Sequence, residues 1–291
     1  MKLFVDELKD GVVRVSATED CPRPYVGVCG SMHGNEPCGR NAVERIAREL
    51  REGALQPHNG TLFLIHANPE ATSQGRRHTP EGADLNRLWD FSFTESLRKE
   101  AWGFEHHRVL ELKEVVGALD VFLDLHSAAT STPPFAVSNG APRVDEIAKR
   151  MGVSFLVQSW YGLADKVIIG FLRLADVPAL SVECGAHNDP EISDKAYRIA
   201  LSFLRVTGAL SDGTEPPGND VRTVHVIETI TKPSAEFHFG SPWTGFQELE
   251  PGALVGRDRV TEIRATRRCY AVLPNENVGV GDDVIYLAVD A

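Results

Sequence analysis

The chain has 291 residues, 42% of them hydrophobic, which is enough for a substantial core and, by length, for one or two domains. A formal net charge of −11 argues against a surface for nucleic acid or anionic membrane, since both need clustered Lys and Arg. The five cysteines are scattered and form no C-x-x-C pair, which argues against a disulfide framework and a cysteine zinc site. With no apolar run of membrane-span or signal-peptide type, we expect a soluble, cytoplasmic protein that binds neither membrane nor nucleic acid.

Up to about residue 210, short apolar runs alternate with longer amphipathic stretches. Nearly continuous apolar runs are typical of strands covered on both faces, and their alternation with helices predicts an α/β domain with a largely parallel sheet. The predicted strands cover residues 25–30, 61–69, 120–126, 153–158 and 179–184.

Two of the amphipathic stretches are predicted to form helices. The first begins at Pro37, which suits a first helical turn, and ends at Gly53, a plausible C-terminal cap. Its apolar positions are Val43, Ile46 and Leu50. The second opens on a capping box formed by Ser92 and Glu95. Its apolar stripe comprises Leu97, Ala101, Phe104, Leu112, Val115 and Leu119.

The composition changes at residues 211–220, which are rich in Pro, Gly and acidic side chains and show no periodicity. We place a linker at 213–220, after an α/β domain over residues 1–212. The remaining residues, 221–291, contain short alternating runs separated by Gly and Pro turns, a pattern that predicts a small all-β domain.

The segment VCGSMHGNEPCG places His33 and Glu36 three positions apart, where an apolar strand gives way to glycines. In open α/β sheets, ligands collect beyond the carboxyl ends of strands, and His126 ends another predicted strand. The three side chains could therefore form the His₂Glu set that binds zinc and leaves one position open. Taken alone, His33 and Glu36 fit equally a loop histidine beside a first-turn glutamate that favours the helix dipole.

Two further motifs carry charge at the ends of apolar segments. In DLNR, Asp84 could accept the second ring N–H of a zinc histidine, while Asn86 and Arg87 could bind a substrate carboxylate; a solvated turn is the alternative. In VECG, Glu183 could act as general base beside a metal, or accept hydrogen bonds from backbone groups.

Five motifs follow one another along the chain in the order HGNEP, NPEA, DLNR, DLHS and VECG. Together they resemble the succinylglutamate desuccinylase and aspartoacylase family, which is related to zinc carboxypeptidases. The resemblance covers residues 25 to 190. It implies a zinc-carboxypeptidase-like mixed sheet flanked by helices, followed by a small all-β C-terminal domain. It also implies one Zn²⁺ per subunit bound by His33, Glu36 and His126, with Glu183 as catalytic base and acid and Asp84 as the hydrogen-bond partner of His33.

By the same resemblance, Asn86 and Arg87 would bind the free carboxylate of the substrate, and Arg77 would stabilise the oxyanion, with Arg76 as the alternative. The expected reaction is hydrolysis of the amide bond of a small N-acyl amino acid or similar amide. A carboxypeptidase acting on short peptides, or a metal-binding protein of the same fold without turnover, remains an alternative. A homo-oligomer is compatible with the sequence.

Overall fold

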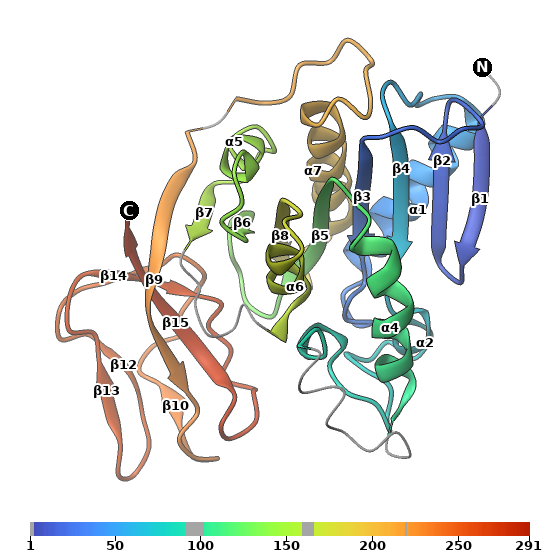
Figure 1. Cartoon of the computed structure of the whole chain (residues 1–291). Helices are drawn as coiled ribbons and strands as arrows, with labels where there is room; N and C mark the ends of the chain where they lie inside the picture. The colour runs from blue at the N-terminus through green and yellow to red at the C-terminus, as the bar shows by residue number, and fades with distance from the viewer. Residues whose placement is uncertain (1–2, 91–101, 159–165, 219) are drawn as a thin grey trace.

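A mixed sheet of 12 strands runs through the molecule, and a separate sheet of 3 strands lies at its C-terminal end (Figure 1). The computed structural model describes residues 3–90, 102–158, 166–218 and 220–291. The large sheet has the order β1-β2-β4-β3-β5-β8-β6-β7-β9-β15-β14-β11 and the small one the order β10-β12-β13. The strands are β1 (Phe4–Lys9), β2 (Val12–Ser16), β3 (Tyr25–Gly30), β4 (Thr61–His66), β5 (Val121–Ala128), β6 (Phe135–Ser138), β7 (Phe155–Gln158), β8 (Ala179–Ala186), β9 (Arg222–Thr231), β10 (His238–Phe239), β11 (Glu248–Leu249), β12 (Leu254–Arg257), β13 (Glu262–Arg264), β14 (Cys269–Val272) and β15 (Asp283–Asp290). The predicted class, a mixed sheet with helices and C-terminal β structure, is confirmed.

Helices cover both faces of the sheet (Figure 1). The helices are α1 (Pro37–Glu52), α2 (Pro69–Ser73), the 3₁₀ helix η1 (Leu85–Arg87), α4 (Phe104–Val116), α5 (Val144–Ala148), α6 (Ile168–Leu174) and α7 (Ile192–Val206). α1, α5 and α7 pack with the strands into one apolar core, and α4 and α6 pack into a second core on the opposite face. Burial of apolar side chains on both faces is why the central strands read as continuous apolar runs.

The five predicted strands are all present; β3 has the predicted ends, and the other four have shifted ends. β4 is shorter than predicted because Asn68 accepts a hydrogen bond from Ala71 N at the start of α2, and Pro69 begins that helix. The central strands β4, β3, β5 and β8 run parallel, as expected. The first two strands were not predicted, and β2 pairs antiparallel with both β1 and β4.

The first predicted helix is confirmed as α1, which begins at Pro37 and is closed by Gly53 in the left-handed conformation (φ 78°). The second predicted helix is present as α4, with Leu112 and Val115 buried. The part of that prediction comprising Ser92, Glu95, Leu97 and Ala101 lies outside the described residues. None of the described helices is long and apolar enough to cross a membrane.

The described C-terminal residues, 221–291, contain strands and no helix, as predicted. Their strands continue the central sheet, because β9 pairs in parallel with β7. Phe246 stacks on Phe155 with ring centroids 3.8 Å apart, which joins the C-terminal segment to the second core. The division of the chain at 213–220 stays a prediction.

Candidate metal centre and active site

The candidate site lies at the carboxyl ends of three neighbouring strands. β3 ends at Gly30, β5 carries His126 near its end, and β8 carries Glu183 directly opposite His126 in the register. Because β3, β5 and β8 are adjacent and parallel, the groups at their carboxyl ends are brought to one edge of the sheet. This topology unites residues from distant parts of the sequence.

Two glycines allow α1 to begin directly against the sheet. A Cβ on Gly30 would lie 2.1 Å from the carbonyl carbon of Gly39, and a Cβ on Gly39 would lie 2.7 Å from the backbone oxygen of Leu125. Backbone therefore packs on backbone at this point, which only residues without a side chain permit. The close approach brings Glu36, the residue preceding α1, to His126 on β5.

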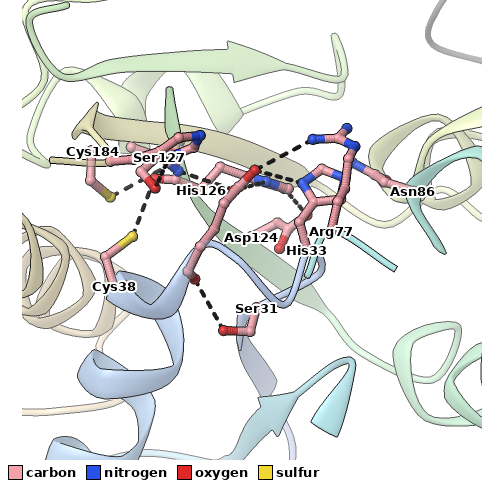
Figure 2. Close-up of polar contacts among 12 residues, drawn as sticks. Ser31, His33, Cys38, Arg77, Asn86, Asp124, His126, Ser127 and Cys184 are labelled. Atoms are coloured by element: carbon pink, nitrogen blue, oxygen red, sulfur yellow. Dashed lines mark hydrogen bonds and ion pairs between the residues drawn. The ribbon is translucent and has the colours of Figure 1, made fainter. Parts of the chain in front are cut away.

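His33, Glu36 and His126 form a buried cluster (Figure 2). His33 Nδ1 lies 2.8 Å from Glu36 Oε1, and His126 Nδ1 lies 2.9 Å from Glu36 Oε2. One ligand atom from each residue lies within 4.8 Å of the others. Two imidazole nitrogens and a carboxylate oxygen that converge in this way are typical of metal binding in proteins.

Each histidine is backed by a carboxylate on its other ring nitrogen. His33 Nε2 lies 3.0 Å from Asp84 Oδ1, and His126 Nε2 lies 2.7 Å from Asp124 Oδ2. A carboxylate only accepts hydrogen bonds, so each Nε2 carries a proton and donates it. A metal bound at the cluster would take the electron pair of Nδ1 on both rings, because Nδ1 faces Glu36 and Nε2 keeps its proton. The donor set therefore fits a divalent metal.

The charges of the cluster are coupled through short contacts. Burial opposes ionisation of Glu36, but His33 and His126 hold the pKa of this carboxyl well below its usual value. Burial also opposes protonation of His126, yet Asp124 and Glu36 raise the pKa of that imidazole well above its usual value. The carboxylate of Glu36 is thus kept ionised, as a metal ligand must be.

Arg77 lies beside this cluster. Its Nε and Nη2 donate to Asp84 Oδ2 at 3.0 and 2.8 Å, and its Nη1 lies 3.6 Å from Glu36 Oε1. Burial opposes ionisation of Asp84, but His33 and Arg77 hold the pKa of that carboxyl far below its usual range. Both arginines are exposed, the Arg77 side chain to 43%, but the side chain of Arg76 makes none of the hydrogen bonds among the described site residues. Of the two arginines considered from sequence, the structure brings Arg77 to the cluster.

Glu183 reaches the same place from β8. Its Oε2 is buried and, among the described residues, has no hydrogen-bond partner. Burial raises the pKa of Glu183 to about 7; the charge of His126 opposes this rise and that of Glu36 adds to it. Burying a carboxylate oxygen without a hydrogen-bond partner costs folding free energy. Such an oxygen therefore indicates a group that binds a ligand or transfers a proton.

Among the described residues, Asn86 and Arg87 form no hydrogen bond or ion pair with the three clustered side chains, and Asn86 N donates to Asp84 Oδ1 at 2.9 Å. Asn86 is buried, and its Oδ1 accepts a hydrogen bond from the backbone N–H of Ile168, at the start of α6. Arg87 is half-buried, and its Nη1 donates to the carbonyl oxygen of Asn86. The Nδ2 group of Asn86 and the other guanidinium nitrogens of Arg87 are the donors that could meet a substrate.

Sequence reasoning missed three residues of the site. Asp124 had a signal, because an acid two positions before His126 on a buried strand faces the same side and needs a partner. Ser127 N donates to Glu36 Oε2 at 3.2 Å, and Ser127 Oγ lies 2.7 Å from His187 Nδ1. Neither Ser127 nor His187 had a signal, because their contact depends on how the loop after β8 returns to β5.

Three comparisons with known proteins identify the family of this chain. Residues 22–205 match the family profile of the succinylglutamate desuccinylase/aspartoacylase catalytic domain. A succinylglutamate desuccinylase of Pseudomonas paraeruginosa is 35% identical over 253 residues, which cover 78% of this chain and 72% of that protein. The N-acyl-aromatic-L-amino acid amidohydrolase (carboxylate-forming) B of Danio rerio is 29% identical over 112 residues, 36% of this chain and 35% of that protein.

Solved structures share the fold over nearly the whole chain. Succinylglutamate desuccinylase from Vibrio cholerae superposes with a TM-score of 0.82 at 19% identity, covering 99% of this chain and 88% of that one. Murine aminoacylase 3 superposes with a TM-score of 0.72 at 19% identity, covering 93% of this chain and 96% of that one. From the family match and the sequence identity together, this chain belongs to the succinylglutamate desuccinylase/aspartoacylase family of amidohydrolases.

Proposed function

We propose that this protein uses zinc to hydrolyse the amide bond of a small N-acyl amino acid, releasing a carboxylic acid and a free amine. The observation that carries the proposal is the buried cluster of His33, Glu36 and His126 beside Glu183, whose Oε2 lacks a partner among the described residues. Relatives of the chain are desuccinylases and amidohydrolases, which supports the reaction class.

His33, Glu36 and His126 would hold the metal. A zinc ion bound there would supply a Lewis acid that polarises a carbonyl and lowers the pKa of water toward ~7. Asp84 and Asp124 support the two histidines by fixing the proton on each Nε2 and increasing the basicity of Nδ1.

Glu183 moves the protons of the reaction. Its buried Oε2, which has no hydrogen-bond partner among the described residues, can take a proton from the attacking water and return it to the nitrogen of the leaving amine. Arg77 stabilises the oxyanion that develops on the attacked carbonyl, since its Nη1 is directed toward Glu36 while Asp84 holds the rest of the guanidinium. The orientation of Arg77 before reaction reduces the cost of reorganisation.

Asn86 and Arg87 bind the carboxylate of the amino-acid portion through Asn86 Nδ2 and the Arg87 guanidinium. The C-terminal segment is hydrogen-bonded to the loop that follows His126. Thr130 Oγ1 donates to the carbonyl of Pro274, and the backbone N–H of Gly245 donates to the carbonyl of Ser131.

The test is amine release from N-acetyl, N-succinyl and N-formyl amino acids and from short peptides, using zinc-loaded protein and a chelator-treated control. We expect release from one narrow class of N-acyl amino acids that stops on chelation and returns with added zinc. Amine release from peptides alone would indicate that the protein is a carboxypeptidase. Failure to release amine despite bound zinc would contradict the proposal.

A further inference from the structure

Glu105, in the first turn of α4, is fully buried, an unusual position for a carboxylate that lacks a cationic partner. Among the described residues, neither Lys nor Arg forms an ion pair with it. Arg108, one turn further along α4, donates instead to the carbonyl oxygens of Ala67, His66 and Asp10 and to Glu111. The burial of Glu105 therefore needs another explanation.

The carboxylate of Glu105 accepts three hydrogen bonds, two of them from Thr79. Oε1 accepts from the backbone N–H of Thr79 at 2.7 Å and from Asn68 Nδ2 at 3.2 Å, and Oε2 accepts from Thr79 Oγ1 at 2.8 Å. Thr79 is thus held through both its backbone and its side chain.

Thr79 lies two residues after Arg77, on the loop of residues 76–84. The carbonyl of Arg77 accepts a hydrogen bond from Gly34 N at 3.3 Å, so the arginine lies between one attachment to the metal-ligand loop and another to Glu105. Gly82 lets the loop close over the carboxylate, since a Cβ there would lie 1.7 Å from Glu105 Oε2. Asp84, which orients the guanidinium, lies two residues after Gly82.

We propose that Glu105 is a positioning residue whose buried carboxylate holds the loop of residues 76–84, and with it Arg77, in place beside Glu36. The inference rests on the oxyanion role proposed for Arg77. Displacement of a catalytic group by about 1 Å can lower a rate by about 10²-fold, which sets the size of the expected effect. The three metal ligands lie outside this loop, and Asp84, which lies in it, supports His33 only through Nε2, so zinc content measured at saturating zinc should not change.

Glu105→Gln, Glu105→Leu and Thr79→Val separate this role from a general contribution to folding. Gln keeps all three contacts, because its oxygen can accept from Asn68 and from the backbone of Thr79 while its amide donates to Thr79 Oγ1. Leu removes all three, and Thr79→Val removes only the hydroxyl contact. Glu114→Leu is the matched control, since Glu114 is on the same helix and its side chain is 77% exposed.

We expect Glu105→Leu to lower kcat by about 10²-fold with little change in KM, Thr79→Val to lower it less, and Glu105→Gln and Glu114→Leu to remain near wild type. Hydrogen exchange should accelerate in residues 76–84 of Glu105→Leu and Thr79→Val, and zinc content should be constant. If Glu105→Leu does not fold, kcat and the hydrogen exchange of residues 76–84 in Thr79→Val test the inference instead.

Wild-type exchange and kcat in Thr79→Val would overturn the inference, as would a Gln variant impaired as strongly as the Leu variant. If the wild-type protein hydrolyses no substrate, the proposed function fails. The exchange measurement still decides whether Glu105 holds the loop, so the two failures are distinguishable.

Discussion

Removal of the carboxylate behind His126 should weaken zinc binding measurably. In Asp124→Asn the amide oxygen can still accept from His126 Nε2, so the ring orientation is preserved while the negative charge is lost. Asp124 is fully buried and its Oδ2 lies 2.7 Å from His126 Nε2, so solvent screens the negative charge of Asp124 only weakly. Losses of this kind typically weaken metal binding by about 10- to 100-fold, or roughly 1.4 to 2.7 kcal/mol.

Asp84→Asn should have a smaller effect on zinc affinity. The negative charge of Asp84 is partly compensated by Arg77, which donates two hydrogen bonds to Oδ2, and the Asp84 side chain is 18% exposed. Competition with a chromogenic chelator at neutral pH measures both affinities. Asp194→Asn is the control, because that side chain is 61% exposed in a surface ion pair. Wild-type affinity in Asp124→Asn, or a larger loss in Asp84→Asn, would refute the reasoning.

The remaining predictions concern packing, the arginines and pH. A Cβ on Gly34 would lie 2.2 Å from the backbone of Ala71, so we expect Gly34→Ala to destabilise the fold by about 1–3 kcal/mol, measured by urea unfolding, and to lower zinc affinity. An unchanged unfolding midpoint would contradict this prediction. Arg77→Ala should lower kcat by about 10²- to 10³-fold and Arg76→Ala should leave it near wild type, and steady-state rates that rank them in the opposite order would exclude Arg77. The hydrogen bond from Arg205 lowers the pKa of Asp212 to about 2 from 3.8, so its contribution is present above pH ~4 and is lost as pH falls through about 2. Because the pair is partly exposed, Asp212→Asn should cost no more than ~1 kcal/mol at neutral pH, and a difference in unfolding free energy that persists at pH ~2 would contradict this assignment.

The sequence allowed the cluster of His33, Glu36 and His126 to be predicted because one rule of sheet topology applies to it. His33 and His126 each follow an apolar run, and parallel strands present their carboxyl ends at one edge. Glu183 was found in the same way, as an acid at the end of an apolar strand. Whether these three residues perform the predicted catalytic roles is a question for the experiments above.

Features that depend on long-range pairing could not be predicted. β9 joins β7, so strands on either side of the predicted linker share one sheet, and local patterns do not specify such partners. The choice between Arg76 and Arg77 depends on which side chain the loop turns toward Asp84. Glu105 was part of a charged helical stretch, and only the packing of Thr79 and Gly82 against it reveals why it is buried.

The most direct test of the central claim is the rate of amine release by Glu183→Gln, measured together with its bound zinc. Gln preserves the size of the side chain but cannot take up the proton of the attacking water. We predict that the variant retains zinc at wild-type stoichiometry and loses hydrolysis of the substrate identified for the wild-type protein. A zinc-loaded Glu183→Gln variant that hydrolyses this substrate at the wild-type rate would contradict the account.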